Sequence, residues 1–204
     1  TKVRYHLLTD GRDVGERSAL GYLSTLETQL ASINESGKDY RVASGGGRMV
    51  VTMDRYNADW PMVEKGWKTH VLGEGRQFAS MAEAVQTYYD EDSKVTDQYL
   101  DSFVIAEDGV PVGTIEDGDS VILFNFRGDR ALEMSMAFEL DEFERFDRVR
   151  RPKVFFAGMM QYDGDMNMPA NYLNEPPEVE GVLGEYLCDT GITSFAISET
   201  QKYG

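Results

Sequence analysis

Basic side chains follow short apolar segments at four places in this chain. Each apolar segment has the length of a strand, and Val121–Phe126, which we expect to be buried, is the clearest example. The basic residues that follow these segments are Arg12, Arg48, Arg127, Arg130 and Lys202. A buried, unpaired charge is very costly, so these side chains must lie where water or an anion can reach them. Guanidinium groups hold carboxylates and phosphates through two parallel hydrogen bonds, so the chemistry to expect is the binding of a small anion.

Strand ends are also where a ligand is expected in this kind of fold. In open α/β sheets, ligands bind outside the carboxyl ends of the strands, so the sequence predicts one anion-binding crevice beside a shared sheet edge. Arg127 and Arg130 lie three residues apart at the start of an expected helix, where cations are unfavourable unless an anion offsets them. Asp13, next to Arg12, can orient or deprotonate a hydroxyl. The alternative for these two residues is an ion pair that only shapes the loop.

The overall charge limits the possible partners. The chain has 204 residues, 36 of them acidic and 20 basic, which gives a net charge of −16. Such a chain repels polyanions, which argues against nucleic acid and against anionic membranes as partners. Cys188 is the only cysteine, so no internal disulfide can form and a reducing compartment is expected. No signal peptide and no apolar run long enough for a bilayer is visible, so we expect a soluble, cytoplasmic protein.

Other motifs do not fit a cofactor site within this chain. The stretch Asp163–Asn167 begins like a calcium loop, but Met168 stands where glycine is needed and Asn174 where glutamate is needed. The two histidines, His6 and His70, are far apart and near no cysteine, which argues against zinc. The glycine run before Arg48 lacks the Gly-Lys-Ser/Thr ending of a phosphate loop. We therefore expect no metal ligands here.

Apolar spacing and capping signals predict the elements that must position the basic residues. Leucines at three- and four-residue steps predict a helix over 17–36, and similar patterns predict helices over 59–72, after Ser80, and over 131–138. Ser80 and Glu83 have the spacing of a capping box. Short strands and turns are expected over 97–115, with a hairpin tip at Asp108 and Gly109. A strand over 153–157 precedes an irregular region over 162–177. These elements predict an α/β fold with a mixed or mostly parallel sheet flanked by helices.

Four of these segments together resemble one known family. They are Thr9–Asp13, Gly47–Arg48 with Met53–Arg55, Asn125–Arg130 and Ser198–Lys202. In this order and at this spacing the chain resembles cofactor-independent (2,3-bisphosphoglycerate-independent) phosphoglycerate mutase along its whole length. Members of that family have an alkaline-phosphatase-like domain with two metal ions, usually manganese, and a serine that carries the phosphoryl group. A substrate-binding transferase domain is inserted into it.

The resemblance implies that this chain is part of a longer protein. Residues 1–176 resemble a partial transferase domain, and 177–204 resemble the segment that returns toward the phosphatase-like domain. The family's metal-binding clusters, its nucleophilic serine and its Ser-Asp-Gly-Gly-Val-His-Ser segment have no counterpart in this sequence. The two manganese ions are therefore expected in the missing domain. The chain also starts and stops beside strand-like segments, which is more typical of an excised fragment than of a complete domain.

The resemblance also implies residue roles. The residues expected to surround the carboxylate and phosphate of the phosphoglycerate are Arg12, Arg48, Arg55, Arg127, Arg130 and Lys202. Asp13 is expected to bind the glycerate hydroxyls and to assist their proton transfers. Two departures affect these assignments: Gly128 stands where proline is common, and Arg48 and Arg55 are one residue further apart than in many members. Arg55 is therefore placed by its Met-Asp-Arg context.

Three functions remain open at this stage. The first is the substrate-holding part of a monomeric mutase that interconverts 3-phosphoglycerate and 2-phosphoglycerate, inactive without its phosphatase-like domain. The second is a non-catalytic module that binds a small phosphorylated acid. In the third the arginines are only structural, paired with Asp10, Asp13, Asp54 and Asp129. The first and second functions require the arginines to lie together, with positive charge that aspartates do not neutralise.

Overall fold

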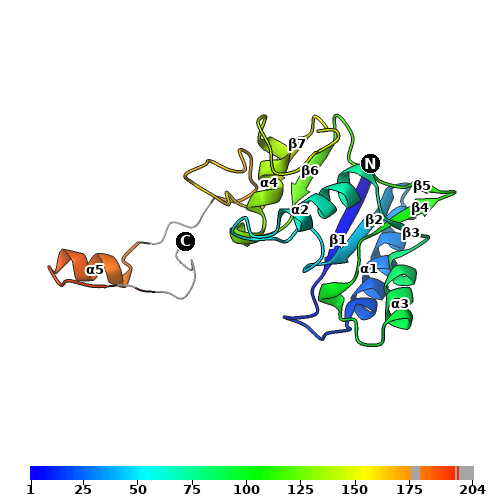
Figure 1. Cartoon of the computed structure of the whole chain (residues 1–204), viewed down its shortest axis with the longest axis horizontal. Coiled ribbons are helices and arrows are strands. Elements are labelled where there is room, and N and C mark those ends of the chain that lie inside the picture. The colour runs from blue at the N-terminus through cyan, green and yellow to red at the C-terminus, as the bar shows by residue number, and fades with distance from the viewer. Residues whose placement is uncertain (176–179, 196, 198–204) are drawn as a thin grey trace. The chain divides into compact units, whose positions relative to one another are not determined.

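The computed structural model describes residues 1–175, 180–195 and 197. The chain divides into two compact units, Thr1–Asn174 and Glu175–Gly204. The first unit contains every strand found in the described residues, together with four helices (Figure 1). The second contains helix α5 (Leu183–Asp189). In the described part of the chain, no helix combines the length and the apolar character needed to span a membrane. The domain boundary expected near 176 stays a prediction about the longer protein.

The main sheet of the first unit is mixed, as the sequence predicted. Its strands are β1 (Lys2–Thr9), β2 (Asp39–Gly47), β3 (Arg76–Phe78), β4 (Phe103–Glu107) and β5 (Val110–Pro111). The order is β1-β2-β4-β3, with β5 paired to β4. β1 runs parallel to β2 and β3 parallel to β4, whereas β2 and β4 are antiparallel. Asp108 and Gly109 form the β4–β5 hairpin tip, both with positive φ, as expected of this dipeptide.

A second, smaller sheet corrects two expectations. β6 (Ser120–Leu123) pairs only with β7 (Phe155–Gly158), in parallel, so the strand ends do not share one sheet edge. Nor is Val121–Phe126 a buried strand: it stops at Leu123, and Phe124 and Phe126 are 78% and 67% exposed. The physical reason is that β6 has one neighbouring strand, so an apolar composition does not place it inside a sheet. The backbone also turns at once, because Asn125 N donates to Leu123 O at 2.9 Å.

Two helices cover one face of the main sheet. They are α1 (Ala19–Asn34) and α3 (Met81–Glu91), which lie side by side (Figure 1). Their apolar faces pack with β4 in a core that includes Leu23, Val85, Phe103 and Ile105. Ser80 caps α3 as predicted, because its Oγ accepts from Glu83 N at 3.1 Å. Both helices thus match the sequence prediction within a few residues.

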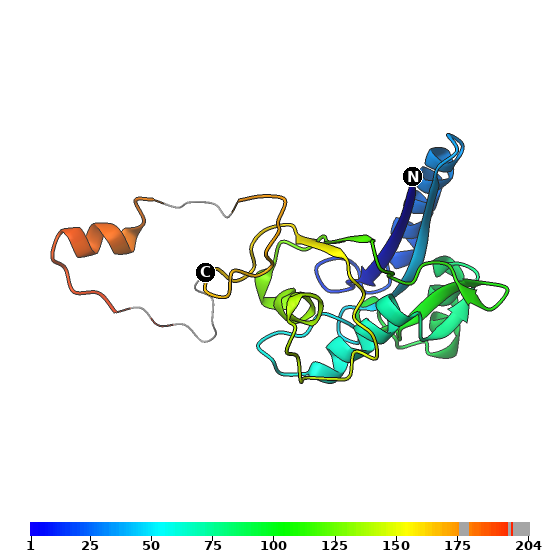
Figure 2. The same ribbon diagram turned by 90° about the horizontal axis from the view of Figure 1, so that it is seen from above.

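The remaining helices form a second core. α2 (Trp60–Trp67) continues as a π-helical turn, η1 (Lys68–Leu72), so the helix predicted over 59–72 is present but changes type. α4 (Leu132–Glu139) lies beside α2, as Figure 2 shows. Trp67 and Val71 from this helical segment pack with Phe138 and with Phe156 of β7. η1 itself contacts β2 and β4 of the main sheet.

The segments outside these elements follow the predictions only in part. Residues 162–175 contain no helix or multi-residue strand, as expected of an irregular region. The apolar segment before Lys202 spans residues 194–197 and was expected to be a strand; this is wrong for its described residues 194, 195 and 197, which are not in a strand. A strand needs a neighbour for its backbone groups, and the described residues of the second unit contain none. Ser198–Lys202 lies outside the described residues.

Candidate anion-binding site

The loop after β1 presents Arg12 and Asp13 on a buried support. Both side chains are exposed, whereas Gly11 between β1 and Arg12 is buried with φ +61°. A Cβ on Gly11 would lie 2.8 Å from Cβ of Asp97, so only glycine fits there. Asp97 lies in a short 3₁₀ turn, η2 (Asp97–Tyr99), and it fixes both ends of the loop. Its carboxylate accepts from Ser18 N at 2.8 Å, and its backbone oxygen accepts from Thr9 Oγ1 at 2.6 Å.

Asp97 therefore caps α1 from a distant part of the chain. Its Oδ2 also accepts from Ala19 N at 2.9 Å, and its Oδ1 accepts from the hydroxyl of Tyr89. Ser18, which occupies the cap position in sequence, makes no side-chain cap. The sequence analysis missed this role, because a capping aspartate is normally sought next to its own helix. The result is a loop whose two ends are held while its middle faces solvent.

The loop after β2 presents Arg48 beside Asp10. Gly47 lets the chain pass close to η2, because a Cβ there would lie 2.4 Å from Gln98 O. Arg48 N donates to Thr9 O at 3.0 Å, which ties the ends of β1 and β2 together. The buried Arg48 guanidinium donates to Asp10 Oδ1 at 2.5 Å and lies 3.7 Å from Asp13 Oδ2. Burial alone would raise the pKa of Asp10, but the hydrogen bond and charge of Arg48, together with hydrogen bonds from the backbone of Asp13 and Arg12, outweigh it and hold that pKa below its ordinary value.

The segment after β6 brings the third group of arginines. It includes a 3₁₀ turn, η3 (Gly128–Arg130), directly before α4. Arg127 Nη2 lies 3.9 Å from Asp13 Oδ2, so this one carboxylate connects Arg48 and Arg127. Arg130 is only 7% exposed and donates to Met53 O at 2.5 Å. Burial lowers the pKa of Arg130, and the positive charges of Arg48, Arg55 and Arg12 lower it further.

The predicted arginines of the first unit thus lie together, although they come from two sheets. Arg55 completes the group, with Nη1 3.8 Å from Asp129 Oδ2. The carboxylates within 4.0 Å of this arginine group are Asp10, Asp13 and Asp129. Asp54 instead accepts from Asp59 N at 2.7 Å, so the expected pairing of Asp54 with an arginine is not seen. Lys202, the remaining predicted residue, lies outside the described residues.

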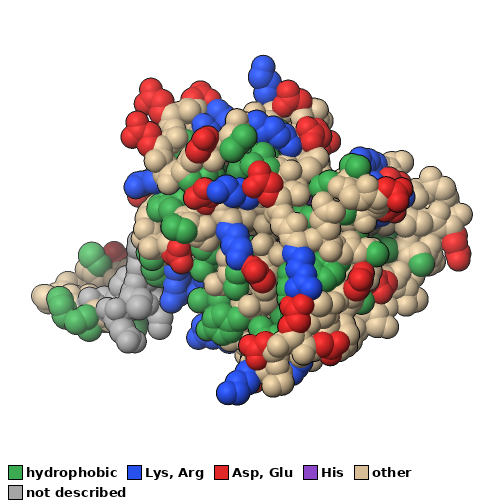
Figure 3. Space-filling view, turned by 45° about the vertical axis from the view of Figure 1, so that its right-hand side comes forward, with side chains coloured by type: hydrophobic (Ala, Val, Ile, Leu, Met, Phe, Trp, Pro, Cys, Tyr) green, Lys and Arg blue, Asp and Glu red, His purple; other side chains and the backbone are tan. Residues whose placement is uncertain are grey.

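The arginine group has more positive charges than there are carboxylates beside it to neutralise them. Among the described residues, five arginines face three carboxylates, and no carboxylate oxygen lies within 4.0 Å of the guanidinium nitrogens of Arg12 or Arg130. The buried Nε of Arg48 also has no hydrogen-bond partner. On the face shown in Figure 3, by contrast, Lys and Arg side chains are interspersed with Asp and Glu. An excess of guanidinium groups in a chain of net charge −16 is the arrangement that an anion would stabilise.

The site has no place for a metal ion among its described residues. No group of three or more His, Cys, Asp or Glu side chains in the described part of the chain could hold one. The donor set is dominated by guanidinium groups, which are cationic and cannot ligate a cation. We therefore assign none of the residues that the structure describes to metal binding.

The structure is an α/β domain that gathers arginines from separate strand ends, and comparison with known proteins assigns the chain to a family. The family model described as "BPG-independent PGAM N-terminus" matches residues 1–164. The chain therefore belongs to the 2,3-bisphosphoglycerate-independent phosphoglycerate mutase family. This confirms the resemblance that the four motifs indicated.

Individual relatives agree with the family model. The chain is 58% identical over 203 residues to a probable 2,3-bisphosphoglycerate-independent phosphoglycerate mutase of Leptospira interrogans, covering 100% of this chain and 37% of the relative. It is 55% identical over 204 residues to the Trypanosoma brucei brucei enzyme, with the same two coverages. A crystal structure of Leishmania mexicana phosphoglycerate mutase at low cobalt concentration matches with a TM-score of 0.88 and 53% identity. That match covers 93% of this chain and 35% of the other, and it confirms the α/β fold.

Proposed function

We propose that this chain is the substrate-holding part of a mutase that interconverts 3-phosphoglycerate and 2-phosphoglycerate. The chain spans 37% of the length of the two relatives above, so the complete reaction is a proposal about a longer protein. The observation that carries the proposal is the excess of guanidinium groups at one site. A phosphoglycerate brings a carboxylate and a phosphate, the latter with a charge of about −1.5 to −2 at neutral pH, which matches that excess.

The arginines have distinct tasks in this proposal. Arg12 and Arg127 are exposed and can grip the ligand with two hydrogen bonds each, while the buried Arg48 and Arg130 supply fixed positive charge. A mutase must keep the glycerate after its phosphoryl group has left, because the same molecule has to be rephosphorylated at its other hydroxyl. Several fixed donors around the carboxylate do this without covalent chemistry. Lys202 adds a further point charge on the resemblance alone.

In this proposal Asp13 carries out the proton transfers. Its carboxylate lies 3.7 Å from Arg48 and 3.9 Å from Arg127, which is beyond hydrogen-bond distance. Its oxygens therefore remain available to accept the proton of a glycerate hydroxyl as that oxygen attacks the phosphoserine. The same carboxylic acid returns the proton when the phosphoryl group leaves in the other direction. The phosphoserine and two manganese ions belong to the phosphatase-like domain, where the metal ions would stabilise charge on the phosphoryl group.

The cellular setting of the proposal is a cytoplasmic monomer acting in glycolysis and gluconeogenesis. The single cysteine, Cys188, is free, which suits a reducing compartment. The monomeric state rests on the family resemblance. Analytical ultracentrifugation of the full-length protein would test it.

Calorimetric titration of the chain with 3-phosphoglycerate and 2-phosphoglycerate tests the substrate assignment. We expect saturable binding of both, no turnover by the chain alone, and roughly tenfold or greater loss of affinity in Arg127→Ala. Arg76→Ala is the matched control, because Arg76 pairs with Glu91 on the exposed surface of β3 and α3. Turnover by the isolated chain, or equal binding in the two variants, would contradict the proposal. Binding without turnover after the phosphatase-like domain is supplied would favour the non-catalytic module.

A further inference from the structure

The loop between β2 and α2 has an unusual backbone. Three residues that are not glycine have positive φ: Thr52 at 70°, Tyr56 at 62° and Asn57 at 56°. This left-handed region is costly for a β-branched residue such as threonine. Such strain persists only where the surroundings force it, and it concentrates at functional sites. The loop carries Arg55 between the strained residues and begins next to Arg48.

The first support of this loop is a buried chain of hydrogen bonds. Nε2 of His70 lies 3.1 Å from Thr52 Oγ1, and its Nδ1 lies 2.7 Å from Ser44 Oγ. Ser44 Oγ in turn lies 2.7 Å from Nδ1 of His6. The π-helical turn η1 brings His70 to this position, and Thr52 N donates to Met62 O at 3.0 Å. π-helical turns are rare and are frequent at functional sites.

His70 is held in its neutral form. Burial, and to a lesser degree the charge of His6, lower the pKa of His70 to about 3. A neutral imidazole has one donor and one acceptor nitrogen, so it can link two hydroxyl groups in series. The link runs from β1 and β2 of the sheet to the strained residue Thr52. It does not end on another regular element, which distinguishes it from a histidine that only fills a core.

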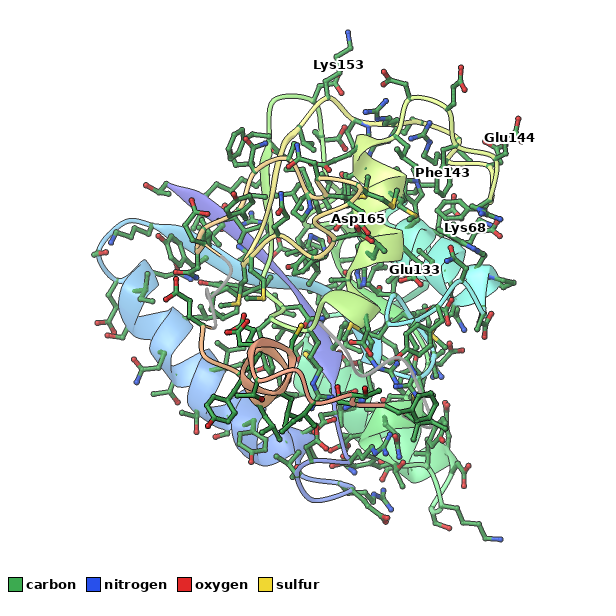
Figure 4. The ribbon with its side chains drawn as sticks, turned by 90° about the vertical axis from the view of Figure 1, so that its left-hand side faces the viewer. Lys68, Glu133, Phe143, Glu144, Lys153 and Asp165 are labelled. Carbon is green, nitrogen blue, oxygen red and sulfur yellow. The ribbon has the colours of Figure 1, made fainter. Side chains whose placement is uncertain are left out.

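The second support is Glu133. It is only 2% exposed, and its Oε1 accepts from Asn57 N at 3.0 Å. Figure 4 shows Glu133 on α4 inside the molecule, whereas Lys153 projects outward. Burial raises the pKa of Glu133; the Asn57 amide opposes this, and the charges of Asp54 and Asp129 add to it. Arg130, which donates to Met53 O, fixes the loop between the two supports.

We propose that His70 and Glu133 are positioning residues, which hold the strained loop 52–57 so that Arg55 and Arg48 face the bound phospho-acid. His70 acts through the hydroxyl of Thr52, and Glu133 acts through the backbone of Asn57. Neither side chain is itself assigned to the ligand. The ligand in this statement rests on the proposed function, whereas the holding of the loop does not.

The experiment compares variants of the 204-residue chain by two readouts. The first is affinity for 3-phosphoglycerate, and the second is hydrogen exchange at the backbone amides of residues 52 and 57. Both amides are bonded, to Met62 O and to Glu133 respectively, so their exchange reports whether the loop is held. The test variants are His70→Leu, Thr52→Val and Glu133→Leu. Each removes one support without adding a charge.

Conservative variants and a distant control separate positioning from stability. His70→Gln and Glu133→Gln keep a polar atom near the Thr52 hydroxyl and near Asn57 N, so they should rescue affinity. Asn34→Ala removes two hydrogen bonds to the backbone of Tyr40, at the amino end of β2 and away from the arginines. It should lower the free energy of unfolding while leaving affinity and loop exchange unchanged.

We expect each test variant to weaken 3-phosphoglycerate binding by roughly tenfold or more and to speed exchange in the loop, because small misplacements of positioning groups are costly. His70→Leu and Thr52→Val remove the same link, so the double variant should lose no more than either single variant. Additive losses, unchanged loop exchange, or a similar loss of affinity in Asn34→Ala would overturn the proposal. If His70→Leu does not fold, Thr52→Val decides, since it keeps the histidines. If the unaltered chain binds no phosphoglycerate, the proposed function fails while the exchange data still decide this inference.

Discussion

The two sides of the arginine site are built differently. On the side of β1 and β2, Arg48 is buried, bonded to Asp10 at 2.5 Å and tied to Thr9 through the backbone. On the side of β6, Arg130 donates to Met53 O at 2.5 Å, whereas Arg127 has Asp13, at 3.9 Å, as the one described carboxylate within 4.0 Å, and it follows a strand of a two-stranded sheet. One side is therefore fixed before any ligand arrives. We expect Arg127 on the other side to complete a bidentate grip when an anion lies between the two sides, because a ligand favours the arrangement that binds it better.

Acid should destabilise the fixed side most. Burial lowers the pKa of His6 to about 4, and burial with the charge of His6 lowers that of His70 to about 3, both from an ordinary value of 6.5. Between pH 6.5 and these values the unfolded chain binds more protons than the folded one. The contribution of the two histidines to the free energy of unfolding is therefore fully present above pH 6.5. It falls as the pH drops, by roughly 1 kcal/mol per pH unit for each histidine.

Urea unfolding between pH 7 and pH 4.5 measures this slope. His70→Gln, which keeps a polar group but does not titrate, should remove about half of it, because one of the two histidines is gone. An unchanged slope in this variant would show that His70 is not buried in its neutral form. The β6 side carries neither histidine, and Glu133 in α4, whose pKa is raised by burial, acts in the opposite direction because its protonation favours the folded state as the pH falls.

Removing Arg48 should affect both folding and binding. Arg48→Ala leaves Asp10 partly buried without its cation, so we expect a loss of roughly 2–3 kcal/mol in the free energy of unfolding. Phosphoglycerate binding should also fall below detection, because the support for the grip is gone. Urea unfolding and calorimetry measure the two effects. Asp10→Asn in the same background should recover part of the stability, and no recovery would mean that the ion pair is not the cause of the loss.

Replacing Arg127 should lower the affinity for phosphoglycerate without a comparable change in the free energy of unfolding. Its side chain is 51% exposed and lies over the Phe126 ring, and the one described carboxylate within 4.0 Å of it is the exposed Asp13, at 3.9 Å. Arg127→Ala should therefore change the free energy of unfolding by less than about 0.5 kcal/mol, as exposed pairs contribute little. Affinity for phosphoglycerate should nevertheless fall by roughly tenfold or more, because the guanidinium meets the ligand. A loss in the free energy of unfolding as large as that of Arg48→Ala would show that Arg127 supports the fold as much as Arg48 does, which would contradict the comparison between the two sides.

The sequence predicts the fixed side better than the other. Local signals such as the leucine spacing of α1, the Ser80 cap and the Asp108–Gly109 turn are short-range, and all three are present in the structure. The motifs locate every arginine of the group. The prediction that Val121–Phe126 is a buried strand is wrong, because the apolar composition of a segment does not show how many strands will lie beside it.

Support from distant residues is the other part that the sequence does not predict. Asp97 caps a helix that begins 78 residues earlier, and His70 reaches Thr52 through a π-helical turn. A buried aspartate or histidine has no spacing signal of its own, since its partners are brought to it by the fold. Only the arrangement of the sheet and helices in space identifies these contacts. This explains why motifs could indicate the groups that we propose to contact the ligand, but could not indicate the groups that support them.

Asp13 lies between Arg48 on one side and Arg127 on the other, and its removal should have the smallest effect on binding. Asp13→Asn removes a negative charge about 4 Å from two arginines and beside the anion, so 3-phosphoglycerate affinity should stay the same or rise by roughly a fewfold. Calorimetry of the chain measures this. In the full-length mutase the same variant should lower kcat by roughly 10²–10⁴ with little change in KM, because an amide cannot accept the hydroxyl proton. A large loss of affinity would instead show that Asp13 holds Arg48 and Arg127 in place. The base for the proton transfers would then have to be another residue.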